Sequence, residues 1–483
     1  MSIKKEPALW QAFMPILVLI LLLSTNVILF ESEATNGPNQ IAMLLAAGVA
    51  GLISFSLGYR WDEIEVSIIK SISSAMGAIL ILMVIGSLSG TWLLSGIVPA
   101  MIYYGLKILN PTIFLFAACM VCCIVSLATG SSWSTVATVG IALLGIGKTL
   151  GIPEPVIAGA IISGSYFGDK MSPLSDTTNL APAMAGTDLF THVRYMVNTT
   201  APTLAITFVI FLVWGFTLDT TFSGTETGAV LQSIEKTFNL TPLLFIVPAL
   251  VILMIVRKVP ALPALLVGSI LGGICAVIFQ PQIINQISGI EGNFLKSSFM
   301  AVMKSMAIDT SIQTDNAMIT KLLSSGGMYG MMNTIWLITC AMTFGGVMES
   351  CGLLKKIAEQ IIKFANSTGS LVASTAATCI FFNLTASDQY MAIAVPGRMY
   401  ADTYRKRGYK PELLSRTLED AGTVTSVLIP WNTCGATQSK VLGVSTWAYA
   451  PYCFFCIISP LMTVFQAYIN YKIRRLSDDD KAI

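Results

Sequence analysis

The chain has 483 residues, of which 54% are apolar and only 11% are charged, whereas soluble domains carry about 25% charged residues. This composition excludes an ordinary soluble protein and predicts a chain embedded in a lipid bilayer. Its formal net charge is only +2, so we expect no nucleic-acid partner.

Uncharged apolar runs recur along the chain at close to the roughly 20 residues that a helix needs to cross a bilayer. In chain order, we predict plain membrane-spanning helices over 9–30, 41–59, 71–94, 195–218, 240–256, 259–280, 328–348 and 447–471. The first run is too long for a cleaved signal peptide, and few small residues follow it, so we expect it to be retained.

Other apolar segments are interrupted by glycine, proline and polar residues and cannot be regular helices. In the first half, the break TGSSW (129–133) predicts a hairpin dipping into the membrane over about 111–147, and a broken helix follows over about 153–186. In the second half, the break TASDQ (385–389) predicts a hairpin over about 367–404, followed by a broken helix over about 411–443. We expect the broken helices to be interrupted at Gly164, Gly168, Pro173, Pro182, Gly422, Pro430 and Gly435.

The order of these segments repeats along the chain. A shift of 256 residues pairs Gly90 with Gly346, Gly96 with Gly352, Thr129 with Thr385, and Ser131 with Ser387. We therefore predict an all-α polytopic membrane protein with two repeated units, 1–218 and 240–483, joined by an external linker at 219–239. If each hairpin returns to its own side, each unit crosses the membrane five times, and the odd number inverts the second unit.

Charge asymmetry predicts the orientation. The segments that this topology puts inside are rich in lysine and arginine, for example at 405–410 and 472–475, whereas the outer loops carry fewer over longer stretches. Basic loops favour the cytoplasmic side. We therefore predict ten crossings with both termini in the cytoplasm, and residues near Ser223 and Gln313 outside.

Carboxylates at membrane depth predict an ion site. Each costs about 2.5–3.5 kcal/mol at the bilayer centre, so Asp169 and Asp176 need compensation. A sodium ion would supply it, because small hard cations prefer carboxylate, carbonyl and hydroxyl oxygens. The predicted ion-binding residues are Thr129, Ser131, Asp169, Ser172, Asp176, Thr177, Thr385, Ser387, Asp388, Asn432 and Thr433. Second-rank candidates are Lys170, Glu419, Asp420, Thr425 and Ser426.

Each charged residue also has a structural interpretation. Asp169 can simply pair with Lys170, and Asp176 can cap a helix that begins at Thr177. Arg416 lies one turn from Glu419 and Asp420 and can pair with either. The single histidine, His192, suits either an interfacial position or a proton relay.

Burial disfavours the charged form of a carboxylate, so an acid at membrane depth can bind protons near neutral pH. One such carboxylate can hold a sodium ion or a proton, but not both at once. This competition is the simplest physical basis for exchanging the two ions.

Three long motifs resemble the NhaC-type sodium/proton antiporter family of the ion transporter superfamily: GSSWSTVATVGIALLGIGKTLGIP, AGAIISGSYFGDKMSPLSDTTNLAPAMAGTDLFTHVRYM and LSRTLEDAGTVTSVLIPWNTCGA. The resemblance covers essentially the whole chain and implies inverted repeats, a homodimer, and coupled sodium and proton movement. It assigns Asp169, Ser172, Asp176, Thr177 and Asn432 to the family's polar motif positions. The family also includes exchangers of malate against lactate, and an organic anion would need a cation such as Lys170 or Arg398.

We therefore predict a secondary transporter that exchanges sodium for protons by alternating access in a bacterial cytoplasmic membrane, without a cofactor. One alternative is sodium-coupled exchange of small carboxylates or amino acids. A channel is a second alternative, which uphill transport would distinguish. A membrane enzyme is a third, but the sequence has no metal-ligand His/Cys cluster, Ser/His pair or nucleotide-binding loop.

Overall fold

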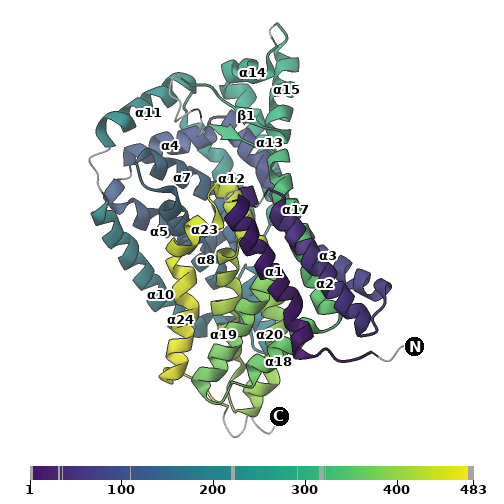
Figure 1. The fold of residues 1–483 in the computed structure, drawn as a ribbon. Coiled ribbons are helices and arrows are strands. Elements are labelled where there is room, and N and C mark those ends of the chain that lie inside the picture. The colour runs from purple at the N-terminus through teal and green to yellow at the C-terminus, as the bar shows by residue number, and fades with distance from the viewer. Residues whose placement is uncertain are drawn as a thin grey trace.

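The computed structural model describes residues 4–30, 33–34, 36–108, 110–218, 223–290, 292–314, 320 and 323–476. Within these ranges the chain is nearly all helical (Figure 1). The only sheet among them pairs β1 (Thr310–Ser311) with β2 (Ser324–Ser325) antiparallel, with Thr310 opposite Ser325. Residues 219–222 of the predicted linker and 477–483 of the second predicted unit lie outside the described residues.

Seven described helices are long and apolar enough to cross a membrane. They are α1 (Leu9–Phe30), α2 (Pro38–Ser56), α3 (Trp61–Leu94), α5 (Pro111–Thr129), α10 (Leu189–Thr217), α13 (Ala261–Phe279) and Tyr329–Ser350, which contains α17 (Met332–Ser350). The number rises to nine if two bent pairs, Gly228–Thr237 with Pro242–Val256 and Thr446–Tyr452 with Phe454–Tyr468, each count as one span. The prediction of a polytopic helical membrane protein is confirmed.

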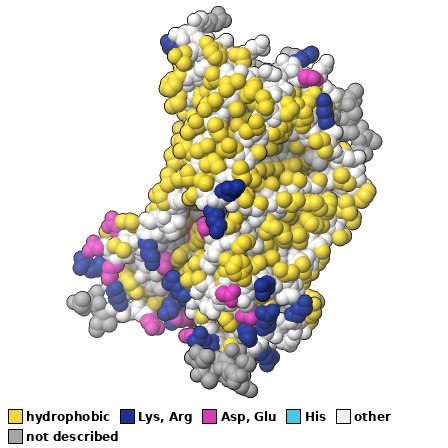
Figure 2. Space-filling view, turned by 180° about the vertical axis from the view of Figure 1, so that it is seen from behind, with side chains coloured by type: hydrophobic (Ala, Val, Ile, Leu, Met, Phe, Trp, Pro, Cys, Tyr) yellow, Lys and Arg dark blue, Asp and Glu magenta, His cyan; other side chains and the backbone are white. Residues whose placement is uncertain are grey.

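The surface agrees with a membrane setting. Hydrophobic side chains cover the middle of the face in Figure 2, and charged side chains gather mainly at its lower end. The described chain enters α1 at that end and leaves α24 (Phe454–Tyr468) there as well (Figure 1).

Helix α3 joins elements that are far apart in the sequence. Its first half packs on α17, where the Ser71 hydroxyl donates to the Met342 carbonyl over 2.8 Å. Its second half packs on α13, where Trp92 Nε1 donates to the Gly268 carbonyl over 3.1 Å. The helix therefore holds parts of both predicted units together.

The interrupted segments break inside the predicted ranges. In the first half they form α5, α6 (Ser132–Thr135), a π-helical turn (Val136–Gly140), α7 (Ile141–Thr149), α8 (Glu154–Met171) and α9 (Asp176–Ala185). In the second half they form α19 (Thr368–Thr385), α20 (Gln389–Lys406), α21 (Pro411–Leu418), a π-helical turn (Glu419–Thr423), a 3-10 turn (Ser426–Leu428) and α22 (Thr433–Leu442). The Gly130 backbone, at φ 71°, provides the left-handed turn that ends α5.

Not every residue expected to break a helix does so. Gly164 and Gly168 lie inside the continuous helix α8, Pro182 lies inside α9 and Gly435 lies inside α22, so the interruptions predicted at these four residues are wrong. A Cβ atom at Gly164 or Gly168 would collide with the backbone of α5, so these two glycines permit close helix packing instead. The break falls at 172–175, where Pro173 disfavours a helical conformation at Ser172.

The remaining helices connect and cover these segments. They are α4 (Ile97–Ile108), α11 (Ser223–Thr237), α12 (Ile246–Val256), α14 (Pro281–Ser288), α15 (Phe294–Ala307), α18 (Leu353–Ile362) and α23 (Thr446–Tyr449), with 3-10 turns at Pro242–Phe245, Tyr329–Met331 and Ala450–Tyr452. Helices α4, α11, α14 and α15 lie toward the upper end in Figure 1.

Candidate functional site

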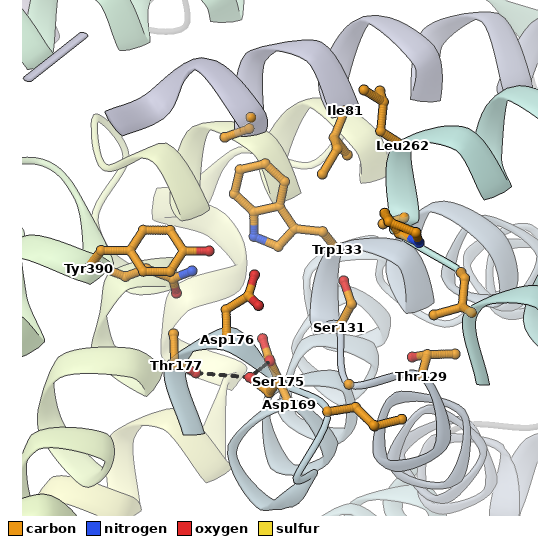
Figure 3. Close-up of a pocket in the computed structure, with 18 of the residues that line it drawn as sticks. Ile81, Thr129, Ser131, Trp133, Asp169, Ser175, Asp176, Thr177, Leu262 and Tyr390 are labelled. Carbon is orange, nitrogen blue, oxygen red and sulfur yellow. Dashed lines mark hydrogen bonds between the residues drawn. The ribbon is translucent and has the colours of Figure 1, made fainter. Parts of the chain in front are cut away.

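A cavity of about 710 Å³ opens where the interrupted segments meet. Its wall comes from the breaks at 129–131, 173–177 and 388–390, from α3, and from the turn at 258–262 that precedes and begins α13. Figure 3 shows the Trp133 indole projecting into it between Ile81 and Asp176. Both predicted units therefore contribute to one cavity, which apolar, polar and charged side chains line together.

Helix N-termini converge on this space. Four helices begin at the breaks, with Ser131, Ser175, Asp388 and Asn432 as their N-cap residues. The Asp388 carboxylate accepts hydrogen bonds from the backbone N–H groups of Tyr390 and Met391, at 2.9 and 3.1 Å. The Ser175 side chain does not cap α9. Its hydroxyl is thereby available to another group.

That group is Asp169, near the C-terminal end of α8. Its two carboxylate oxygens accept hydrogen bonds from Ser132 Oγ and Ser175 Oγ, each at 2.6 Å. The Thr177 hydroxyl lies 3.1 Å from the Ser175 hydroxyl, which extends the cluster along the cavity wall (Figure 3). Asp169 is only 6% exposed and forms no ion pair with any described residue. The structural interpretation of Asp169 as a partner of Lys170 is therefore wrong.

The charges around the cavity favour a cation. Its charged lining residues are Asp169, Asp176, Asp388 and Lys258. Three carboxylates against one ammonium give the interior a negative potential. Asp176 is exposed and begins α9 itself, so the interpretation of Asp176 as the cap of a helix starting at Thr177 is also wrong.

The structure divides the predicted ion-binding residues into two groups. Those that line the cavity are Thr129, Ser131, Asp169, Asp176, Thr177, Asp388 and Thr433. Those that do not line it are Ser172, Thr385, Ser387, Asn432 and all five second-rank candidates. Several of the second group stabilise the breaks; Asn432 Nδ2, for example, donates to Asn383 Oδ1 over 3.1 Å.

The second-rank candidates include a buried ionic cluster. Lys170 Nζ pairs with Asp420 Oδ1, and both side chains are completely buried. Arg416 Nε lies 4.0 Å from Asp420 Oδ2, so the expected Arg416 pairing falls on Asp420 and not on Glu419. His192 is buried as well, and its Nδ1 lies 2.8 Å from Ser415 Oγ. His192 lies in the first turn of α10, the helix entrance expected for it, and its interfacial position and its role as a proton relay both stay predictions.

Four contributors are not among the predicted ion-binding residues. Ser132 and Ser175 hold Asp169, and Trp133 and Gln389 line the cavity. Within the described residues, Trp133 Nε1 and Gln389 Oε1 are buried without a hydrogen-bond partner. Ser132, Ser175 and Gln389 each adjoin a residue expected to bind ions, and Trp133 is two positions from Ser131. That closeness to a break was the signal available.

Apolar spanning helices around an acidic interior cavity define a polytopic membrane protein with a site for a small polar or charged solute. A family model described as the Na⁺/H⁺ antiporter family matches residues 164–470, more than half of the chain. The chain belongs to the Na⁺/H⁺ antiporter family.

The relatives of this chain are named for more than one exchange activity. The Na⁺/H⁺ antiporter NhaC of Alkalihalophilus pseudofirmus is 36% identical over 89% of this chain and 90% of its own. The malate-2H⁺/Na⁺-lactate antiporter of Bacillus subtilis is 36% identical over 89% of each chain. The arginine/ornithine antiporter ArcD of Halobacterium salinarum is 34% identical over 97% of this chain and 94% of its own.

Proposed function

We propose that this protein is a secondary active transporter that exchanges Na⁺ for H⁺ across a bacterial cytoplasmic membrane by alternating access. The observation that carries the proposal is Asp169, a buried carboxylate at the cavity wall with two hydroxyl partners and no ion pair among the described residues. A buried unpaired carboxylate is costly unless a cation or a proton neutralises it. Membership of the Na⁺/H⁺ antiporter family supports sodium and proton as the two neutralising ions.

We assign sodium to oxygen ligands at the meeting point of the breaks. The carboxylate of Asp169 and the hydroxyls of Ser132, Ser175 and Thr177 are already grouped there. Asp388 faces the same cavity from the second half of the chain. This oxygen-rich, negatively charged set has the chemistry that a hard monovalent cation prefers.

The two predicted units also form part of the proposal. In this view, 1–218 and 240–483 are inverted repeats, and α5, α8 and α9 correspond to α19, α21 and α22. The similar order of a long helix, a break and a second broken helix in both halves supports this correspondence. The hairpins and broken helices would carry the ion, while plain helices such as α3 and α17 would form a scaffold, in a homodimer.

Orientation has its own test. Both described chain ends lie at the end of the molecule where charged side chains gather (Figures 1 and 2), which supports cytoplasmic termini. Single cysteines introduced at Ser223 and Gln313 in a cysteine-free variant should react with an impermeant maleimide added from outside. Labelling of either position only from inside would contradict the inverted topology.

Transport is tested with purified protein in liposomes that contain a trapped pH dye. We expect a sodium gradient, but not a choline gradient, to move protons in the opposite direction. Asp169→Asn should abolish this movement. Asp402→Asn is the matched control, because Asp402 is exposed on α20 and does not line the cavity. Normal exchange by Asp169→Asn would remove Asp169 from the mechanism.

A second candidate function is sodium-coupled exchange of a small organic solute. A cavity of about 710 Å³ is far larger than one sodium ion needs. Two of its lining residues carry polar atoms, Trp133 Nε1 and Gln389 Oε1, that are buried without a hydrogen-bond partner among the described residues. The malate/lactate and arginine/ornithine relatives favour carboxylates or amino acids. Uptake of labelled malate, lactate and arginine into the same liposomes decides this, and Trp133→Phe should weaken organic uptake while sodium/proton exchange continues.

A further inference from the structure

A second buried ionic cluster lies beside the sodium site and has no role in the exchange described so far. Lys170 follows Asp169 on α8, and its ammonium pairs with Asp420 at the π-helical turn of the second broken helix. Ser459 on α24 joins the pair: its hydroxyl donates to Asp420 Oδ1 over 2.8 Å and accepts from Lys170 Nζ over 3.1 Å. The cluster therefore touches both broken helices.

A second cation is buried in the same place. Arg416 is completely buried. Its Nε atom lies 4.0 Å from Asp420 Oδ2, and its Cζ atom lies 4.8 Å from the centre of the Tyr195 ring. Its Nη1 lies 3.5 Å from Gln466 Oε1, at the limit of a hydrogen bond. Asp420 therefore serves two cations, and its single negative charge can neutralise only one of them.

Glu419 adjoins this cluster but takes no part in its pairing. The side chain is completely buried, and neither carboxyl oxygen makes a hydrogen bond to any described residue. The Thr423 hydroxyl is near enough to interact with the carboxyl, but it too lacks a bond of normal geometry within the described chain. An ionised carboxylate is very costly in such a setting, so this conformation suits the protonated, neutral form.

The packed elements around Glu419 supply its electrostatic surroundings. Asp169, Lys170 and Asp420 are within electrostatic reach of it, as is Cys379 on α19. The elements packed on this turn are α9, α19, α20, α21 and α24. Their other titratable groups that are buried or line the cavity are Asp176 on α9, Tyr390, Tyr400 and Tyr404 on α20, Glu412 and Arg416 on α21, and Cys456 on α24. Glu412 forms an ion pair with Arg474 over 3.3 Å, and His192 is hydrogen-bonded to Ser415.

The charges of this region balance only in particular combinations. Lys170 and Arg416 lie beside Asp420, and Asp169 is within electrostatic reach of Glu419 without pairing to either cation. These four charges sum to zero when Glu419 holds its proton and no sodium is bound, and the cavity residues Asp176, Asp388 and Lys258 add the same charge whichever ion is bound. Sodium at Asp169 adds one positive charge to a buried region. Loss of one proton from Glu419 to the open aqueous side restores zero. Because uncompensated charge is costly at low dielectric, binding of one ion favours release of the other.

We propose that Glu419 carries the proton that is exchanged for the sodium ion held at Asp169, and that the two sites are coupled by the charge of one buried cluster. This inference rests on the proposed sodium/proton exchange and adds where the proton binds. It replaces competition of both ions for Asp169 with two linked sites, and it predicts one proton per sodium.

The test is Glu419→Gln, which keeps the shape and neutrality of the protonated side chain but cannot release a proton. In liposomes, we expect this variant to retain exchange of labelled ²²Na⁺ for unlabelled Na⁺ and to lose sodium-driven proton movement. The dissociation constant for sodium should change by roughly tenfold per pH unit in the unmodified protein, as release of one proton requires. It should become independent of pH in Glu419→Gln.

Glu412→Gln is the matched control, because the same substitution is made seven positions earlier at a buried glutamate that already has a partner. It should behave like the unmodified protein. If Glu419→Gln still couples sodium to protons, or if its sodium affinity keeps the original pH dependence, Asp169 itself holds the proton and our inference is overturned.

Two further measurements keep the inference testable if Glu419→Gln does not fold. Glu419→Asp retains an acid and should retain coupling. Infrared difference spectra of the unmodified protein should show loss of a protonated carboxyl band when sodium is added, and persistence of that band would overturn the proposal. If the unmodified protein moves no protons in a sodium gradient, the proposed function is wrong, and this inference is wrong with it. If the unmodified protein exchanges sodium for protons and the Glu419→Gln variant still does so, only this inference is overturned.

Discussion

Removing one side of the Lys170–Asp420 pair should be among the most destabilising single changes in this protein. Loss of one partner from a buried ion pair costs about 3–5 kcal/mol, because the other charge is left in a medium that solvates it poorly. Both side chains are completely buried here. The two single variants should differ, because they leave different groups behind.

Lys170→Met leaves Asp420 with the Ser459 hydroxyl at 2.8 Å and Arg416 at 4.0 Å, so its cost should be near the lower limit of about 3 kcal/mol. Asp420→Asn leaves both Lys170 and Arg416 without an anion, so its cost should approach about 5 kcal/mol. The combined variant Lys170→Met/Asp420→Leu removes both charges of the pair and should be more stable than Asp420→Asn alone.

The assay is equilibrium unfolding in mixed detergent micelles, followed by the near-ultraviolet signal of the buried aromatic residues. Measurements at mildly acidic pH keep Glu419 protonated, so it does not replace the missing charge. Asp62→Asn is the control, because it breaks an ion pair with Arg60 whose side chains are 77% and 73% exposed, and it should not change stability measurably. A cost for Asp420→Asn equal to or below that for Lys170→Met would refute our reasoning about the residual partners.

Three further predictions concern the cavity and the helices that form it. Asp169→Asn should weaken sodium binding by about 100-fold or more, because it removes a buried charge; isothermal titration with sodium measures this, and unchanged affinity would contradict it. Asp388→Asn should keep protein yield, because asparagine caps a helix as well as aspartate does, but should lower sodium affinity non-additively with Asp169→Asn; additive effects in the double variant would separate the two residues. Gly168→Leu should prevent close packing of α8 on α5 and reduce the yield of folded protein, because overpacking costs about 1–3 kcal/mol or more. Gly48→Leu should be tolerated, because the space beside Gly48 is open. Equal yields of the two variants by size-exclusion chromatography would refute the packing role of Gly168.

The positions of the breaks followed from local chemistry. The polar breaks at 129–133 and 385–389 and the break at Pro173 act through the backbone of their own segment, so the sequence indicated them directly. The left-handed turn at Gly130 and the N-caps at Ser131, Ser175, Asp388 and Asn432 were not predicted. The interrupted segments that line the cavity were predictable for the same reason as the breaks, whereas the contributions of α3 and of the turn at 258–262 were not. Asp169 stood out because a carboxylate between apolar runs needs compensation wherever the fold puts it.

The pairing inside the site was not predictable, because it depends on tertiary packing. Lys170 and Asp420 are 250 residues apart, and no local pattern links them. Lys170 was expected beside its neighbour Asp169, but successive helix residues project about 100° apart, so the two side chains serve different surroundings. The interruptions predicted at Gly164 and Gly168 were wrong for a related reason. A single sequence does not distinguish a glycine that ends a helix from a glycine that lets a neighbouring helix pack closely.

The π-helical turn at Glu419–Thr423 has a consequence for the family's evolution. Such a turn contains one residue more than an α-helical turn, so it acts as an inserted residue in an otherwise regular helix. Deleting that residue would leave a regular α-helix whose two flanks keep their register, and the change would fall on the turn itself, which carries Glu419 and Asp420. Arg416 and Asn432, which lie on either side of the turn, would keep their places. Insertions and deletions in this turn should therefore be excluded among functional relatives, even where substitutions on either side are accepted.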